Sequence, residues 1–148
     1  MFDFEVKKME ERHLEQIERL EKLCFSVPWS KALLKEEISK QNSNFLVAES
    51  NGNVVLGYVG FNFVVDEGYI TNLAVFPEYR CNGIAEKLLK KVIEFARSLN
   101  LKFVSLEVRK SNVTAISLYE RLNFLNVGIR KNFYSLPSED AVIMTLYL

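Results

Sequence analysis

Hydrophobic and polar positions change their spacing along the chain, and these changes predict alternating strands and helices. Residues 2–6 alternate between apolar and charged side chains, as in a strand with one buried face. Residues 10–24 and 31–40 carry apolar side chains three or four positions apart, which is typical of amphipathic helices, and Ser30 can cap the second of them. The N-terminal part is therefore predicted to form one strand followed by two helices.

A hairpin and a central strand are predicted next. The apolar segments 45–49 and 54–64 are separated by an Asn-Gly dipeptide, which is typical of tight hairpin turns. Residues 69–76 form the following strand, which Pro77 ends because proline has no N–H group to donate. A short polar loop then leads to a long helix with one apolar and one charged face.

The last third of the chain returns to strand-like patterns. Residues 101–109 predict a strand, and Ser111 or Asn112 can cap the short helix that follows it. Residues 124–134 and 141–148 predict a final pair of strands. The predicted order is β-α-α-β-β-β-α-β-α-β-β. It indicates an α/β protein with a mixed central sheet of about seven strands flanked by four helices.

Length and composition limit the function classes. A chain of 148 residues is expected to form one domain, spanning residues 1–148, with a proper core. A formal net charge of zero does not favour broad attraction to nucleic acid, and no apolar run approaches the length of a membrane span. We therefore expect a cytoplasmic protein with no membrane and no direct nucleic-acid partner. Cys24 and Cys81 are expected to be reduced thiols, and His13 a surface residue.

The loop between the central strand and the long helix is the first candidate for chemistry. A strand, a tight turn and a helix start leave backbone N–H groups without partners, and the helix dipole strengthens the resulting anion site. Gly83 has no Cβ, so the backbone there could approach a phosphate closely. The alternative is an ordinary strand-to-helix turn that contains an incidental glycine.

This loop carries a resemblance to a known family. Residues 80–85, with the sequence Arg-Cys-Asn-Gly-Ile-Ala, fit the Arg/Gln-x-x-Gly-x-Gly/Ala signature of the GCN5-related N-acetyltransferase (GNAT) family. The predicted element order resembles that fold along the whole chain. The resemblance implies that acetyl-CoA is the co-substrate, that the loop wraps its pyrophosphate, and that a bulge in the preceding strand frees a backbone N–H beside the pantetheine. No metal is expected. Arg80 and Ala85 stand where Gln and Gly are frequent, which the signature permits.

Glu107 is the most informative carboxylate. It lies inside an apolar strand, where a charged side chain is costly unless it is at an edge, paired or in a cleft. The functional interpretation of that position is a general base. The alternatives are a solvated carboxylate or one paired with Arg109, and the residues alone leave these interpretations open.

Other segments resemble one group within the family, the bacterial ribosomal-protein-alanine N-acetyltransferases (RimI). These segments are residues 25–30, 106–112, 115–120, 122–124, 130–134 and 139–144. The resemblance implies that Glu107 accepts a proton, that Tyr119 donates one, and that Asn112 contacts coenzyme A. The residues that it assigns to acetyl-CoA are Leu73, Ala74, Val75, Arg80, Cys81, Asn82, Gly83, Ile84, Ala85, Glu86, Asn112 and Tyr119.

Three aromatic residues have both a functional and a packing interpretation. A phenol with a pKa of about 10 can protonate a leaving thiolate whose pKa is about 8.5, yet Tyr119 also has the helical spacing of a core residue. The resemblance places Trp29 beside the acceptor groove and Tyr134 against the acceptor's N-terminus. Trp29 could instead be a hydrophobic plug on the core, and Tyr134 an aromatic at a strand end.

The sequence thus predicts an N-alpha-acetyltransferase that transfers acetyl directly from acetyl-CoA. The acceptor that the resemblance implies is the N-terminal alanine of small-subunit ribosomal protein eighteen. A route through an acetylated Cys81 is disfavoured, because that residue falls in the phosphate loop, far along the cofactor from the thioester. The alternatives are a GNAT enzyme acting on lysine or a small amine, and a non-catalytic acyl-CoA-binding module. We expect a monomer or weak dimer.

Overall fold

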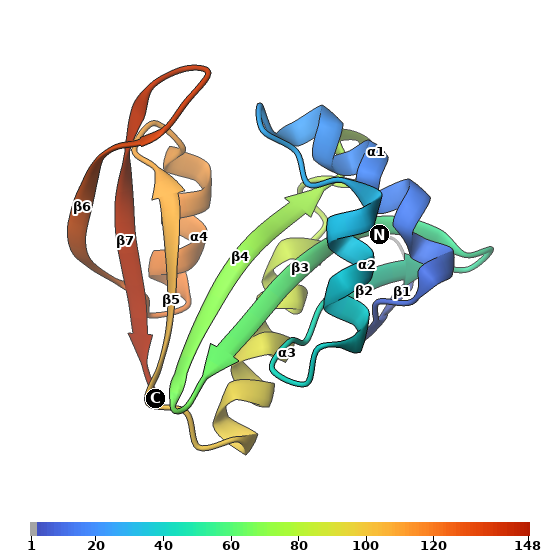
Figure 1. Cartoon of the computed structure of the whole chain (residues 1–148), viewed down its shortest axis with the longest axis horizontal. Helices are drawn as coiled ribbons and strands as arrows, with labels where there is room; N and C mark the ends of the chain where they lie inside the picture. Colours follow the sequence, from blue (N-terminus) through green and yellow to red (C-terminus); the bar gives the residue numbers. More distant parts are fainter. Residues whose placement is uncertain (1–2) are drawn as a thin grey trace.

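The computed structural model describes residues 3–148, and the strands and helices follow the predicted order (Figure 1). The elements are β1 (Phe4–Lys8), η1 (Glu11–His13), α1 (Leu14–Cys24), α2 (Lys31–Ser39), β2 (Leu46–Ser50), β3 (Val54–Val64), β4 (Glu67–Val75), η2 (Pro77–Tyr79), α3 (Ile84–Ser98), β5 (Phe103–Arg109), α4 (Val113–Arg121), β6 (Leu125–Tyr134) and β7 (Glu139–Tyr147). Residue 2, which belongs to the first predicted strand, lies outside the described residues. None of the described helices is long and apolar enough to cross a membrane.

The strands form one mixed sheet in the order β1-β2-β3-β4-β5-β7-β6. Only β4 and β5 run parallel, and they pair over three positions, from Glu67–Tyr69 with residues 103–105. Beyond these pairs the two strands separate, as Figure 1 shows for the green and orange arrows. On its other side β4 contains a bulge, because Gly60 pairs with Asn72 while the next residue of β3 pairs with Ile70. Because β4 and β5 separate after three pairs, the sheet is split near its centre.

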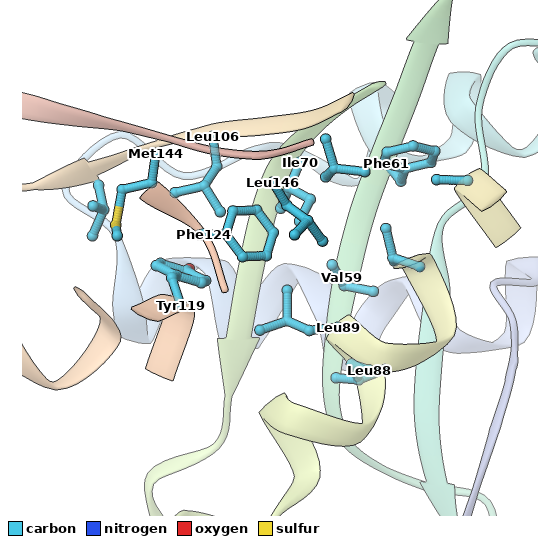
Figure 2. Packing of buried hydrophobic residues seen from close by; sticks show 14 of the residues in the cluster. Val59, Phe61, Ile70, Leu88, Leu89, Leu106, Tyr119, Phe124, Met144 and Leu146 are labelled. Atoms are coloured by element: carbon cyan, nitrogen blue, oxygen red, sulfur yellow. The ribbon is translucent and has the colours of Figure 1, made fainter. Parts of the chain in front are cut away.

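Helices cover both faces of the sheet, so the core has two parts. On one face α3 and α4 contribute Leu88, Leu89 and Tyr119 to a cluster with β3, β5 and β7, part of which Figure 2 shows. On the other face α1 and α2 contribute Ile17 and Leu34 to a second cluster with β2 and β3. Alternate strand residues supply the two clusters, as the period-two pattern predicts.

Two caps agree with the sequence signals. The Ser30 hydroxyl accepts a hydrogen bond from Leu33 N–H at 3.2 Å, at the start of α2. Of the two candidates before α4, Asn112 is the cap, since its Oδ1 accepts from Ala115 N–H at 3.1 Å. Each cap satisfies a backbone donor that the first turn of a helix leaves without a partner.

The expectation that His13 lies at the surface was wrong, because its side chain is completely buried. Its Nδ1 accepts from Glu10 N–H at 3.0 Å, and its Nε2 lies 2.9 Å from a carboxylate oxygen of Glu49 on β2. Arg12 and Lys7 also contact that carboxylate, at 3.1 Å each. Burial is tolerated because both ring nitrogens and the carboxylate have partners.

The Glu49 cluster predicts a specific loss of stability in acid. Hydrogen bonding from Arg12 lowers the pKa of Glu49 from 4.5 to about 2. A carboxylate whose folded pKa is lowered stabilises the fold above pH 4.5, and this contribution is lost as the pH falls toward 2. The shift corresponds to about 3 kcal/mol. Urea unfolding at pH 7 and pH 3 should show a smaller pH effect for Glu49→Gln than for the wild type.

A matched control for this experiment is Glu5→Gln. The Glu5 side chain is 78% exposed and contacts Lys7 at 3.7 Å, so its substitution should leave the wild-type pH dependence in place. If Glu49→Gln and the wild type lose equal stability between pH 7 and pH 3, the ion cluster does not stabilise the fold as described.

Candidate active site

A cavity of about 480 Å³ lies where β4 and β5 separate. Its walls come from the α1–α2 connection, residues 70–73 of β4, residues 106–109 of β5, and the ends of β6 and α4. Six residues that the sequence predicted for the site line this cavity: Trp29, Leu73, Glu107, Asn112, Tyr119 and Tyr134. Ala74, Val75 and the loop of residues 80–86 lie outside the described walls. The fold thus brings together side chains that are far apart in the sequence.

Glu107 is both paired and placed in the cavity wall. Its carboxylate lies 3.2 Å from Arg130 Nε, and its side chain is 33% exposed. The sequence raised Arg109 as an alternative partner, but Arg109 pairs instead with Glu139 at 3.1 Å. The Glu107 carboxylate is therefore accessible from the cavity while a cation on the neighbouring hairpin stabilises its charge.

Tyr119 combines the packing role with a position on the cavity. The residue is 6% exposed, and its ring lies beside Phe124 with 5.7 Å between ring centroids, as Figure 2 shows. It also lines the cavity. Burial raises the pKa of Tyr119 well above the ordinary value, and the charge of Tyr134 adds to the effect. The phenol therefore carries its proton at neutral pH.

Trp29 and Tyr134 also line the cavity, and each ring packs against a further side chain. Trp29 lies 5.8 Å from Phe45, measured between ring centroids, in the core under α1 and α2. The ring of Tyr134 stacks under the guanidinium of Arg109, whose central carbon is 4.5 Å from the ring centroid. Burial raises the pKa of Tyr134 to about 12, with a further contribution from the charge of Glu107. Each ring therefore has a fixed position in the cavity wall.

Two loops that line the cavity are joined to each other. The Ser26 hydroxyl, in the α1–α2 connection, donates to the carbonyl of Ser135, in the β6–β7 loop, at 3.2 Å. Arg109 donates to the same carbonyl at 3.0 Å and to Ser26 Oγ at 3.3 Å. These loops lie together at the end of the molecule toward which β4 and β5 separate (Figure 1). The cavity is thus bounded by a hydrogen-bonded bridge.

The loop before α3 has the backbone geometry of an anion site. Gly83 is the N-cap of α3 with φ of +76°, and among residues 3–148 nothing beyond its own neighbours in the chain lies within 4 Å of where its Cβ would be. The first bond of α3 joins Lys87 N–H to the carbonyl of Gly83 at 3.1 Å, so the N–H groups of Ile84, Ala85 and Glu86 have no partner within the described helix. The loop therefore presents open backbone donors at the positive end of a helix.

The side chains of this loop hold its shape. The amide of Asn82 donates to the carbonyls of Tyr79 and Arg80, at 3.0 Å each. Arg80 Nε donates to the carbonyl of Val75 at 3.1 Å, and its Nη2 to Cys24 Sγ at 3.4 Å. Arg80 thus connects the loop to the end of β4 and to α1. Arg80 uses only two of its five N–H groups in these contacts, so its guanidinium also has donors left for an anion beside the backbone groups.

Comparisons with known proteins identify the fold. A model of the acetyltransferase (GNAT) family matches residues 14–124. The chain belongs to this family. The chain is 34% identical over 146 residues to the ribosomal protein bS18-alanine N-acetyltransferase of Haemophilus influenzae. The aligned region covers 97% of this chain and 98% of that relative. The enzyme of the same name from Escherichia coli K12 is 32% identical over 143 residues, 95% of each chain. A crystal structure of the Escherichia coli ribosomal-protein-S18-alanine N-acetyltransferase has a TM-score of 0.89 at 29% identity, covering 98% of this chain and 94% of that one.

As a GNAT enzyme, the protein is an acyltransferase that uses acetyl-CoA. The open space beside Gly83 and the free N–H groups that follow it fit the pyrophosphate of this co-substrate. On the β5 side, the β4 backbone beyond Tyr69 has no strand partner among residues 3–148, and it can therefore bond to the pantetheine arm. When bound, acetyl-CoA supplies the activated acetyl group.

The GNAT cavity also contains two buried polar residues that the sequence pattern did not single out. Glu21 of α1 is 1% exposed and Asn72 of β4 is 7% exposed, and both line the cavity. Two weak signals could have pointed to them. Asn72 lies within a strand, where asparagine is disfavoured, and Glu21 follows Ile17 by four positions on the buried stripe of its helix.

The phosphate loop predicts a matched pair of glycine variants. Gly83→Val forces a branched residue into a left-handed conformation and fills the space that a phosphate needs. Acetyl-CoA affinity measured by calorimetry should fall about tenfold or more, equivalent to about 1.4 kcal/mol. Gly52 also has a left-handed φ, of +86°, but it lies in the β2–β3 turn. Gly52→Val should therefore lower stability alone, and an unchanged affinity in folded Gly83→Val would exclude the loop as the phosphate site.

Proposed function

We propose that the protein acetylates the α-amine of a peptide N-terminus, with the N-terminal alanine of ribosomal protein bS18 as its acceptor. The observation that carries the proposal is the cavity between β4 and β5, which Glu107 and Tyr119 both line. The names of the relatives with 32–34% identity over almost the whole chain support the same acceptor. The acetyl group is proposed to pass directly from acetyl-CoA to the amine, with no acetylated cysteine.

The bridge between the two loops supports an acceptor that enters by its end. Ser26 and Arg109 both bond with the β6–β7 loop, so the α1–α2 connection and that loop are joined beside the cavity. A peptide N-terminus can enter such a bounded space, because the chain continues from the acceptor amine in one direction only. The α-amino group has a pKa near 8, against about 10.4 for a lysine side chain, so a modest base is enough to deprotonate it.

Glu107 is proposed to accept a proton from the acceptor ammonium, directly or through one water. Its carboxylate is accessible from the cavity, and Arg130 Nε lies 3.2 Å from it. Tyr119 is proposed to donate a proton to the departing thiolate. Burial raises the pKa of Tyr119, so the phenol carries its proton when the thiolate forms.

The remaining predicted residues are proposed to position the two substrates. Leu73, Ala74 and Val75 would lie along the pantetheine, and residues 80–86 would hold the pyrophosphate. Asn112 would contact coenzyme A with its amide nitrogen, because its Oδ1 already caps α4. Trp29 and Tyr134, which both line the cavity, would contact the first residues of the acceptor. A backbone N–H freed near the bulge of β4 would stabilise the oxyanion, a contribution on the order of 3 kcal/mol.

Peptide acceptors test the proposed reaction. The wild type should acetylate the α-amine of an Ala-initiated peptide with the N-terminal sequence of bS18, and mass spectrometry should place the acetyl group on the first residue. The same peptide with a blocked N-terminus and an internal lysine should not react. Equal turnover of the blocked lysine peptide or of a polyamine would contradict the α-amine assignment.

Two substitutions test the proposed acid–base pair. Glu107→Gln keeps the shape of the side chain but cannot take a proton, so kcat should fall by roughly 10² to 10⁴ while acetyl-CoA affinity stays near the wild-type value. The loss should shrink at high pH, where the amine deprotonates unaided. Tyr119→Phe keeps the packing and removes the hydroxyl, so kcat should fall without a change in stability comparable to core disruption.

Tyr147→Phe is the matched control for Tyr119→Phe, because Tyr147 is 60% exposed on β7 and outside the cavity wall. It should retain wild-type kcat. Normal kcat in Tyr119→Phe would reduce Tyr119 to a packing residue. Normal kcat with an unshifted pH profile in Glu107→Gln would exclude Glu107 as the base.

A further inference from the structure

Arg109 lies beside Glu107 on the cavity wall but does not pair with it. The two residues are two positions apart on β5, so their side chains leave the same face of the strand. The Arg109 side chain is 25% exposed and lines the cavity. Glu107 has its cationic partner in Arg130 of β6. The guanidinium of Arg109 is therefore free to make other contacts.

The terminal nitrogens of Arg109 join two loops. Nη2 donates to the carbonyl of Ser135 at 3.0 Å and to the hydroxyl oxygen of Ser26 at 3.3 Å. Nη1 donates to the carbonyl of Pro137 and to Oε1 of Glu139, at 3.1 Å each. These bonds engage all four hydrogens of the two nitrogens. One side chain thus holds the α1–α2 connection and the β6–β7 loop together.

The guanidinium is itself held in one arrangement. Its central carbon lies 4.5 Å from the centroid of the Tyr134 ring. Glu139, which binds Nη1, is fixed in turn, because its other carboxylate oxygen accepts from Ser111 N–H at 2.6 Å. A cation over an aromatic ring and a charge-assisted hydrogen bond to a fixed carboxylate both limit the side chain. Tyr134 is consequently held by the same group that holds the loop.

The β6–β7 loop depends on these side-chain contacts. Its residues 135–138 lie between the two strands, and none of them takes part in a backbone-to-backbone hydrogen bond within the described part of the chain. The carbonyls of Ser135 and Pro137 accept from Arg109 instead. Ser26 supplies one more donor to Ser135. Removing Arg109 therefore removes two of the hydrogen bonds that place this loop beside the cavity.

We propose that Arg109 is a positioning residue for the acceptor, because it holds Tyr134 and the β6–β7 loop against the α1–α2 connection. The inference rests on the proposed function, which places the acceptor beside Trp29 and Tyr134. A loop that is fixed before the acceptor arrives lowers the entropy cost of binding it. Arg109 takes no part in proton transfer, since a guanidinium stays protonated in proteins.

The contacts of Arg109 lie apart from the co-substrate site and from the proposed base. None of the contacts described above involves residues 80–86, and Glu107 keeps Arg130 as its partner. A substitution at Arg109 should therefore weaken acceptor binding while acetyl-CoA binding and proton transfer to Glu107 continue. This selectivity separates a positioning role from a general loss of structure.

The first test compares Arg109→Gln with Arg109→Lys. Arg109→Gln breaks the fork, so KM for the Ala-initiated peptide should rise about tenfold, as expected for the loss of one or more hydrogen bonds. KM for acetyl-CoA, kcat and the pH profile of kcat should stay near the wild-type values. Arg109→Lys keeps the charge, but one ammonium cannot replace a planar fork, so it should raise the peptide KM by a similar factor.

Thermal unfolding shows whether each variant folds, and Arg109→Lys replaces Arg109→Gln if the glutamine variant does not. An unchanged peptide KM in a folded variant would overturn the proposal. A KM for acetyl-CoA that rises by the same factor as the peptide KM would also overturn it, because the change would then not be confined to the acceptor.

Ser26→Ala tests the bridge between the loops, because the Ser26 hydroxyl bonds with both Ser135 and Arg109. It should raise the peptide KM by a smaller factor than Arg109→Gln. Both substitutions break the same bridge, so the double variant should raise KM by less than the product of the two single factors. Factors that multiply would overturn the bridge as the means by which Arg109 acts.

Arg12→Gln is the matched control. The Arg12 guanidinium also joins two segments, since it donates to Glu49 on β2 at 3.1 Å and to Asn53 in the β2–β3 turn at 3.4 Å, but it lies outside the cavity wall. It should lower stability without changing the peptide KM. If the wild type acetylates a lysine peptide or a polyamine in place of the Ala-initiated peptide, the proposed function fails. The same KM ratios, measured with that amine, then decide the role of Arg109.

Discussion

The early end of the pairing between β4 and β5 is the constraint on which the rest of the site depends. Two parallel strands that stay paired satisfy each other's backbone, but here the pairing stops after three positions. Beyond Tyr69 the polar backbone of β4 faces the gap, and it requires a ligand or water to satisfy it. The bulge at Thr71 bends the strand in the same region. This separation opens the cavity, and it explains why residues from both halves of the sheet line it.

Two carboxylates lie in the wall of this cavity, and their surroundings suit them to different work. Glu107 is partly exposed, lines the cavity and has one cationic partner, Arg130, so a substrate can reach its carboxylate. Glu21 is buried and holds donors from Trp29 and Tyr58, so it fixes geometry instead. Environment, more than residue type, separates an accessible carboxylate from a structural one.

Buried carboxylates with polar partners anchor both ends of the helical segment, residues 11–24, to the sheet. At its start, Arg12 and His13 bind the carboxylate of Glu49 on β2. At its end, the carboxylate of Glu21 binds the hydroxyl of Tyr58 on β3. Buried polar pairs of this kind are costly when incomplete, so each constrains where α1 can lie. The α1–α2 connection, which bounds the cavity, consequently starts from a fixed point.

The sequence by itself determined the order of strands and helices, because the hydrophobic period reports local geometry directly. The Ser30 cap and the strand end at Pro77 were also predictable, since each depends on neighbours within a few residues. Only the tertiary structure decided which polar residues meet. The sequence pattern placed His13 at the surface, whereas in the structure it is buried beside Glu49, which comes from a strand distant in the sequence. Whether Glu107 was solvated, paired or in a cleft also depended on long-range packing, as did the contact of Glu21 with Tyr58, because a buried polar group is defined by contacts that a local pattern does not contain.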